Sequence, residues 1–213
     1  MSILWMFRLC LIGCLFILIM IFAYFLRNRE KYTVILENPT INIISVILFN
    51  IFCYIPMIIP SDERIIQKPS IFNHPFNGRW FDILGLILMI LGVFMLLRTI
   101  FLRRAIGAQD TGGKLLTNGI YSFCRHPIYF GIIIISLGFG LRGINIDGLI
   151  VFPLVLIANV TQAKLEEIYD VGIRFKEEYS NYKKQTRMFG TIWFWSILFI
   201  SLVFPLVIAL LTK

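Results

Sequence analysis

The sequence predicts an all-α integral membrane protein with about six membrane segments, two of which form a helical hairpin. Of its 213 residues, 58% are apolar, whereas soluble domains contain about 45–50%. The apolar residues gather in long stretches, and most Lys and Arg lie in the segments between them. Such clusters follow the positive-inside rule, so the net charge of +8 does not indicate a nucleic-acid partner.

The apolar stretches have the length that a bilayer requires, either singly or as a pair. A hydrocarbon core of ~30 Å needs about 20 helical residues. Four stretches have this length: 5–26, 41–60, 80–102 and 192–211. The first has no small-x-small cleavage site and is expected to stay as an anchor, while Pro56 and Pro60 are expected to kink or end the second. Stretches 127–141 and 148–163 are shorter and are expected to pair as the hairpin.

The basic residues fall in alternate loops. Most Lys and Arg lie in loops 27–31, 98–114 and 164–187, and few lie in 61–79 and 142–147. The positive-inside rule then puts both termini on the non-cytoplasmic side. It also brings the polar loop 105–125 to the cytoplasmic face, together with the charged segment 164–188, which is expected to lie along the interface as an amphipathic helix.

The cysteines indicate neither disulfides nor a metal site. They are Cys10, Cys14, Cys53 and Cys124. The sequence has no Cys-x-x-Cys pair and no Cys/His spacing suited to zinc. We therefore expect no metal, and we interpret Cys124 as a small buried residue.

The stretch 114–131 concentrates the polar chemistry of an otherwise apolar chain. It holds Gly119, two tyrosines and the pair Arg125 and His126, directly before Pro127. Ionisable groups are costly at a membrane and tend to mark working sites there. Proline favours the first turn of a helix, so the free N–H groups and positive dipole end of that helix would face the loop. Such an end attracts a carboxylate, and we expect the active site here.

Two acidic residues are expected to face the same site. Glu166 and Glu167 follow the second stretch of the hairpin, on the face that also carries the polar loop. His126 and Tyr129 are three residues apart and can share one side of the helix start. Because carboxylates and aromatic rings attract cations, the site suits a zwitterionic ligand that also carries a cation.

Three motifs stand out: Gly119-x-Tyr121-x3-Arg125-His126-Pro127-x-Tyr129-x-Gly131, the pair Glu166-Glu167, and Phe175-x2-Glu178-Tyr179-x2-Tyr182. Together they resemble the isoprenylcysteine carboxyl methyltransferase family, whose architecture the phospholipid N-methyltransferases share. The resemblance covers residues 114–189. We expect one membrane domain over 1–213, with N-terminal spans in 1–104, a catalytic core in 105–189 and a C-terminal span in 190–213.

The resemblance implies S-adenosylmethionine as the methyl donor, in a cytoplasmic pocket that a lipid or prenylated acceptor enters from the bilayer. The residues expected by position to line the cofactor are Lys114, Leu115, Leu116, Tyr121, His126, Pro127, Ile128 and Tyr129. Counting eight residues back from Phe175 puts the cofactor-contacting glutamate of the family at Glu167, with Glu166 as the second choice.

Three positions depart from the family pattern. Lys176 follows Phe175 where the family usually has glycine, and the second glutamate position falls on Ile168. The arginine that handles the prenylcysteine carboxylate would fall near Ala163, with Lys164 beside it. These departures leave the acceptor open.

The first expected acceptor is the carboxylate of an isoprenylated cysteine or a similar amphiphilic acid. Carboxylate attack on a sulfonium gives neutral products, which a water-poor pocket favours. Arg125 would orient the carboxylate for in-line attack, and we expect Arg125 and Glu167 to be the catalytic residues. Tyr179 and Tyr182 are interpreted as residues of an interfacial aromatic belt.

Two alternatives stay open. A phospholipid amine of the phosphatidylethanolamine type would need His126 or a glutamate as general base, because an amine must lose a proton. A small transporter or a non-catalytic membrane protein is the alternative outside the enzymes.

Overall fold

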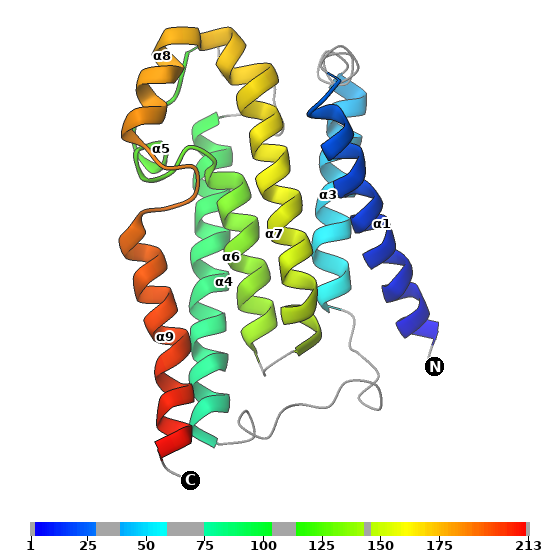
Figure 1. Cartoon of the computed structure of the whole chain (residues 1–213), viewed down its shortest axis with the longest axis vertical. Coiled ribbons are helices and arrows are strands. Elements are labelled where there is room, and N and C mark those ends of the chain that lie inside the picture. The colour runs from blue at the N-terminus through cyan, green and yellow to red at the C-terminus, as the bar shows by residue number, and fades with distance from the viewer. Residues whose placement is uncertain (1–2, 29–38, 59–74, 104–113, 143–145, 212–213) are drawn as a thin grey trace.

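The computed structural model describes residues 3–28, 39–58, 75–103, 114–142 and 146–211, which fold as helices (Figure 1). The long helices are α1 (Ile3–Phe25), α3 (Pro39–Ile58), α4 (Pro75–Arg103), α6 (Pro127–Leu141), α7 (Ile146–Glu166) and α9 (Ile192–Leu211). The short helix α5 (Ile120–Phe123) precedes α6, and a π-helical turn over Glu167–Val171 leads from α7 into α8 (Gly172–Gln185). The described residues contain no strand, which confirms the all-α class.

The long helices follow the apolar stretches of the sequence. Each predicted segment has a helix within a few residues of its expected bounds. The described part of helix α3 runs through Pro56 and stops two residues later at Ile58, and Pro60 lies outside the described residues. Within the described part of the chain, Trp5–Phe25 and Arg79–Leu102 are long and apolar enough to cross a bilayer. Crossing by about six segments stays a prediction.

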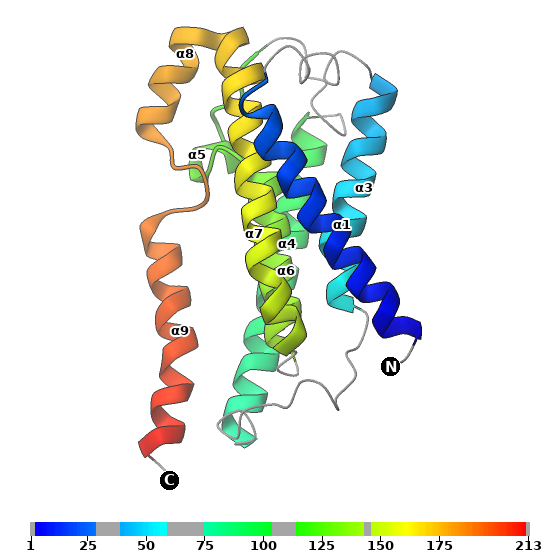
Figure 2. The same ribbon diagram turned by 45° about the vertical axis from the view of Figure 1, so that its right-hand side comes forward.

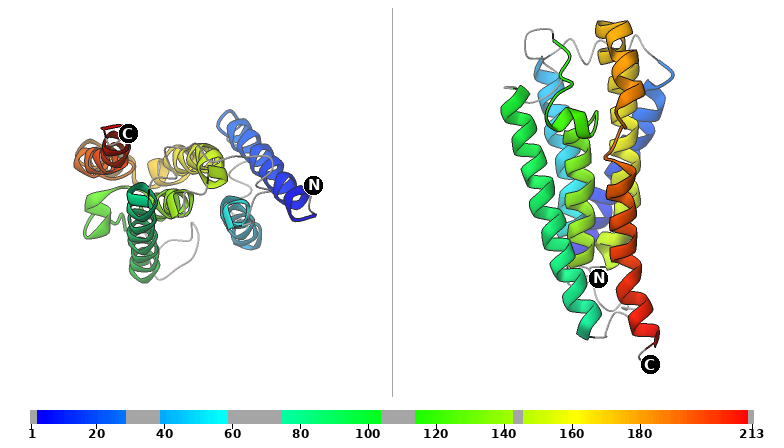
Figure 3. Two further views of the ribbon diagram at one scale, coloured as in Figure 1. Left: turned by 90° about the horizontal axis from the view of Figure 1, so that it is seen from below. Right: turned by 90° about the vertical axis from the view of Figure 1, so that its left-hand side faces the viewer.

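Helix α6 is the centre of the bundle. It packs against α4 and α7, with α1 and α3 on the α7 side and α9 against α4 (Figure 3). Its residues 132–135 are four buried isoleucines, and a helix that is apolar on every side belongs in a core. Helices α6 and α7 lie antiparallel beside each other, as the predicted hairpin (Figure 2).

Two glycine pairs let α4 and α6 approach closely. A Cβ atom at Gly138 would lie 2.6 Å from the backbone oxygen of Gly85, and one at Gly92 would lie 2.7 Å from that of Gly131. Interiors are close-packed, so atoms this near force the backbones apart. Small residues are the usual means by which helices in lipid gain van der Waals contact. The two pairs therefore set the spacing of the central helices.

We expect Gly138→Ala to destabilise the protein, although alanine ordinarily favours a helix over glycine by about 1 kcal/mol. The added methyl group meets the backbone of α4, and overpacking of this kind costs about 1–3 kcal/mol. Gly13→Ala is the matched control, because a Cβ atom at Gly13 meets nothing within 4 Å. The thermal unfolding midpoint in detergent should fall for the first variant and hold or rise for the second. Equal midpoints would contradict this packing.

The outward faces of α1, α4 and α9 are apolar. Their exposed large side chains include Phe16, Ile17, Ile90, Phe94, Trp193 and Phe199. Contiguous apolar surfaces of this extent are rare on soluble monomers and mark contact with lipid or with other proteins. They agree with the apolar composition in indicating a membrane protein.

Several helices end at the end of the bundle that carries α5 and α8 (Figure 1). Helices α1, α4 and α7 all end there, with Arg27, Arg98 and Lys164 near their last turns. Helix α1 begins and α9 ends at the opposite end of the bundle. The loop before α6 and the segment after α7 therefore meet on one face, and the assignment of that face to the cytoplasm stays a prediction.

The segment 164–188 is not the single amphipathic helix that its sequence predicts. Helix α7 continues to Glu166, the π turn follows, and the backbone of Lys176 is non-helical. Helix α8 therefore folds back toward α5 and buries Tyr179 and Tyr182 (Figure 1). The periodicity of polar and apolar residues does not reveal the π turn or the break at Lys176, because the residues at both places fit the pattern of a continuous amphipathic helix.

Candidate active site

The site forms where the start of α6, the end of α7 and the segment after α8 meet. Gly119 precedes α5 with a φ of 66°, a conformation that is open to glycine. Helix α5 ends at an extended Cys124. The N–H groups of Arg125 and His126 then donate to the carbonyls of residues 187 and 188, at 2.9 and 3.3 Å. The chain entering α6 is thereby held against the chain leaving α8.

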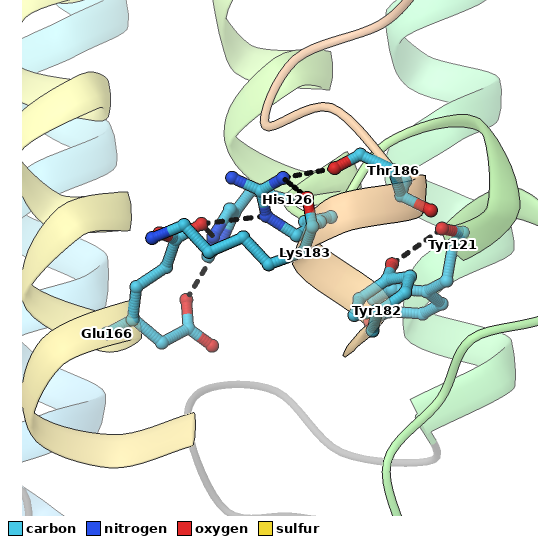
Figure 4. Close-up of polar contacts among 8 residues, drawn as sticks. Tyr121, His126, Glu166, Tyr182, Lys183 and Thr186 are labelled. Atoms are coloured by element: carbon cyan, nitrogen blue, oxygen red, sulfur yellow. Dashed lines mark hydrogen bonds and ion pairs between the residues drawn. The ribbon is translucent and has the colours of Figure 1, made fainter. Parts of the chain in front are cut away.

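Glu167 is the centre of a buried ion cluster (Figure 4). Its Oε1 accepts a hydrogen bond from Arg125 Nε at 2.9 Å and lies 3.0 Å from His126 Nε2. All three side chains are more than nine-tenths buried. The glutamate lies 42 and 41 positions along the chain from its two partners, so the hairpin of α6 and α7 is what brings them together.

Two further side chains complete the ion cluster. His126 Nδ1 lies 3.5 Å from Glu166 Oε2, so each ring nitrogen faces a carboxylate. Lys183 Nζ lies 3.1 Å from Glu167 Oε2 and approaches from solvent, since its side chain is 55% exposed. Arg125 Nη1 donates to the carbonyls of Lys183 and Thr186. Arg125 therefore clamps the end of α8 to the start of α6.

Burial and charge act in opposite directions on the pKa values of the ion cluster. Burial lowers the pKa of His126, but the hydrogen bonds and charges of Glu166 and Glu167 outweigh it and raise the pKa above its ordinary value. Burial raises the pKa of Glu167, and the hydrogen bond and charge of His126, together with Arg125, bring it far below its usual range. Opposite charges at hydrogen-bond distance favour the ionised forms. His126 therefore favours its protonated form.

Tyr179 and Tyr182 line this site, which corrects their interpretation as interfacial belt residues. Both are buried in one cluster with Tyr121, and the Tyr182 hydroxyl donates to the Tyr121 carbonyl at 2.5 Å. The Tyr179 hydroxyl is buried beside the Glu167 carboxylate, and it makes no hydrogen bond of ordinary geometry among the described residues. Burial raises its pKa, and the charge of Glu167 beside it raises it further.

A cavity of about 210 Å³ adjoins the tyrosine cluster. The residues that line it are Arg98, Leu102, Leu115, Leu116, Thr117, Asn118, Gly119 and Tyr121. Three of the predicted cofactor residues therefore share one pocket, and Lys114 is exposed just before them. The cavity is smaller than the ~300–1,000 Å³ of typical ligand pockets, so it has room for part of such a ligand.

The other predicted cofactor residues lie away from this cavity. His126 belongs to the ion cluster, and its ring centroid is 5.8 Å from that of Tyr129. Ile128 and Tyr129 pack against the core that α1, α3 and α7 form, and Pro127 is buried in the first turn of α6. The structure thus divides the predicted set into a pocket group, an ion-cluster group and a core-facing group.

The π-helical turn Glu167–Val171 lies where the sequence departs from the family pattern by one position. A π turn holds one residue more than an α turn and is frequent at functional sites. The count of eight residues back from Phe175 places the second glutamate position on Ile168. A count that allows for one inserted residue places the two positions on Glu166 and Glu167. Ile168 is exposed, whereas both glutamates are buried and face His126.

Lys176 has a backbone conformation that suits glycine. Its φ is 38° and its ψ is −106°, and residues with a side chain rarely adopt positive φ. The family that the sequence resembles usually has glycine here. Lys176 therefore has a side chain at a position where the backbone adopts a conformation that suits glycine.

Lys176→Gly is expected to raise the free energy of unfolding by about 1 kcal/mol. Relief of a strain of about 1–3 kcal/mol exceeds the roughly 0.5–1 kcal/mol that glycine loses in chain entropy. The control is Glu177→Gly, at the next and exposed position, which should lower the free energy by about 1 kcal/mol. Denaturant titration in detergent measures both, and a loss of stability in both variants would contradict the strain.

The cysteines and acidic residues form no further reactive centre among the described residues. Burial raises the pKa of the Cys124 thiol to about 12, so this thiol stays protonated, as a packing residue should. All four cysteines are free. In the part of the chain that the structure covers, no group of three His, Cys, Asp or Glu side chains is placed to hold a metal ion.

The comparison with known families bears on the region around this site. Residues 80–170 match the family model for phospholipid methyltransferases. The match runs from α4 through α7 into the π turn, and so includes the arginine, the histidine and both glutamates of the ion cluster. The match makes this region similar to the phospholipid methyltransferases, and it does not single out isoprenylcysteine as the acceptor. Neither the curated proteins nor the solved structures gave a match.

Two parts of the ion cluster have no counterpart in the predicted site. Lys183 is one of two adjacent lysines on an exposed helical face, a pattern typical of a solvated surface. The Thr186 carbonyl is a backbone group and leaves no trace in a sequence. The one-residue mismatch at Ile168 was the signal that could have revealed the π turn.

Proposed function

We propose that the protein transfers a methyl group from S-adenosylmethionine to a lipid-like acceptor at the membrane. The observation that carries the proposal is the pair of buried glutamates on His126 at the start of α6, within the region that matches phospholipid methyltransferases. The apolar outer faces allow an acceptor to arrive from the bilayer. In the same proposal the chain crosses the membrane several times, with the site on the cytoplasmic face, where the basic residues gather.

The chemistry of the residues present fits this methyl donor. The donor carries a sulfonium, an ammonium, a carboxylate and an adenine ring. Glu166 and Glu167 supply counter-charge for the cations, and the buried Tyr179 hydroxyl beside them can supply a hydrogen bond. The cavity lined by Leu115, Leu116 and Tyr121 offers an apolar slot for a flat ring. The first N–H groups of α6, which no side chain caps, suit a carboxylate.

The residues of the chain bind and orient, since the donor itself supplies an electrophilic methyl group on sulfur. Glu167 provides negative charge in a site from which water is largely excluded. Arg125 has two nitrogens engaged, by Glu167 and by backbone carbonyls, so it positions that glutamate. Its further role in orienting an acceptor carboxylate stays a prediction. Correct placement of two reactants supplies a large part of the rate in such transfers.

Two acceptors are candidates, and a different observation favours each. The family match favours a phospholipid amine. Because His126 favours its protonated form, the candidate base for such an amine is Glu166, whose contact with the histidine is the longer one at 3.5 Å. The Arg125-His126-Pro127 motif favours the carboxylate of an isoprenylated cysteine, which needs no base.

The deciding experiment supplies methyl-labelled donor to the purified protein with either phosphatidylethanolamine or a farnesylated cysteine in mixed micelles. Label in one lipid product and not in the other assigns the acceptor. Calorimetry with S-adenosylhomocysteine tests the donor independently. If no saturable binding is found, the methyltransferase proposal is wrong, and a transporter or a non-catalytic protein takes its place.

A further inference from the structure

We infer that Lys183 is a resident counter-ion of Glu167, which the ammonium group of the methyl donor displaces when the donor binds. The inference rests on the proposed function and concerns how the site admits a cation. Lys183 Nζ lies 3.1 Å from Glu167 Oε2, whereas Arg125 and His126 both contact Oε1. Lys183 therefore contacts the oxygen of Glu167 that neither Arg125 nor His126 contacts.

The charges of the ion cluster require a resident cation to leave. Arg125, Lys183 and a protonated His126 carry three positive charges, against two on Glu166 and Glu167. The donor carries a sulfonium and an ammonium against one carboxylate, so it would add one further positive charge to this excess. Like charges repel strongly where little water screens them. One resident cation must therefore move away before the donor can bind tightly.

Lys183 is the cation that can leave. The side chains of Arg125 and His126 are 7% and 6% exposed, and Arg125 is also held by backbone carbonyls. The Lys183 side chain is 55% exposed, and ion pairs this accessible contribute little to stability. Its flexible stem can swing into water without opening the bundle. A lysine ammonium also has the same chemistry as the ammonium that would replace it.

The position of Glu167 supports this exchange. Glu167 lies beside the buried Tyr179 hydroxyl and acts on its pKa. Tyr179 belongs to the cluster that includes Leu115, Leu116 and Tyr121, which line the cavity. A ligand with its ring in the cavity would extend along this tyrosine cluster toward Glu167.

Calorimetry on Lys183→Met tests the inference with two ligands in the same detergent. S-adenosylhomocysteine carries the ammonium, whereas methylthioadenosine lacks the whole amino-acid part. Loss of a competing exposed ion pair should tighten S-adenosylhomocysteine binding by about two- to five-fold and leave methylthioadenosine binding unchanged. The gain should shrink at high salt, because salt screens the pair in the unmodified protein. Lys184→Met, at the adjacent exposed position, should change neither affinity.

Each other outcome has a definite meaning. Unchanged or weaker S-adenosylhomocysteine binding by Lys183→Met overturns the inference, and the weaker case assigns the lysine to the carboxylate of the ligand. If both ligands bind more tightly by the same factor, or if Lys184→Met gives the same gain in affinity, the effect comes from general surface charge and the inference is overturned. If the unmodified protein binds neither ligand, the proposed function falls together with the inference.

Discussion

Glu167→Gln is expected to weaken S-adenosylhomocysteine binding by about 10- to 100-fold, the usual effect of losing a charged hydrogen-bond partner. Glutamine keeps the shape of the side chain but removes the charge that three cationic groups share. The ammonium group of the ligand then has no carboxylate at position 167 to pair with. Calorimetry measures the affinity, and circular dichroism at the same temperature shows whether the variant is folded.

The control for this loss is Glu178→Gln. Glu178 lies on α8 and is exposed, so it is a glutamate on the same helical segment outside the ion cluster. Its replacement should leave S-adenosylhomocysteine affinity within about two-fold, because exposed charges contribute little. A folded Glu167→Gln variant with unchanged affinity would remove Glu167 from the cofactor site.

Arg125→Ala is expected to lower the free energy of unfolding by about 3–5 kcal/mol, since removal of one partner leaves a buried charge uncompensated. The Arg125 and Glu167 side chains are 7% and 5% exposed and 2.9 Å apart. The arginine also holds the carbonyls of Lys183 and Thr186. Its loss should therefore loosen the end of α8 as well. Titration with a denaturing detergent measures the change in free energy.

Arg142→Ala provides the matched comparison for an exposed ion pair. Arg142 lies 3.6 Å from Asp82, and each side chain is 53% exposed. Such pairs contribute about 0–1 kcal/mol, so the variant should unfold close to the unmodified protein. Similar losses for both arginines would show that burial does not distinguish them, and the clamp assigned to Arg125 would be wrong.

The long helices were predictable because the residues that make each one helical lie within the stretch itself. A stretch such as 192–211 is apolar along its whole length, and no other part of the chain is needed to make it helical. The start of α6 was predictable for a similar reason, since Pro127 suits a first turn. The meeting of His126 with Glu167 was also within reach, because a hairpin returns its second helix to the level where the first began.

The folding back of α8 was out of reach, because its cause is not local. Tyr179 and Tyr182 lie in a stretch with charged residues on both sides, as they would on a helix lying in a membrane interface. Only the two breaks before them turn these rings toward Tyr121 and away from lipid. The Lys183 contact depends on the same breaks, so a surface lysine became part of the site through backbone geometry that its sequence does not display.

The π turn has a consequence for insertions and deletions along this part of the chain. One residue advances an α-helix by about 100°, so the additional residue in Glu167–Val171 works as a rotational offset between α7 and α8. Deleting any single residue of that turn is expected to remove this offset and rotate α8 about its axis. The aromatic rings and Lys183 would then point elsewhere, even though every one of those side chains would still be in the protein.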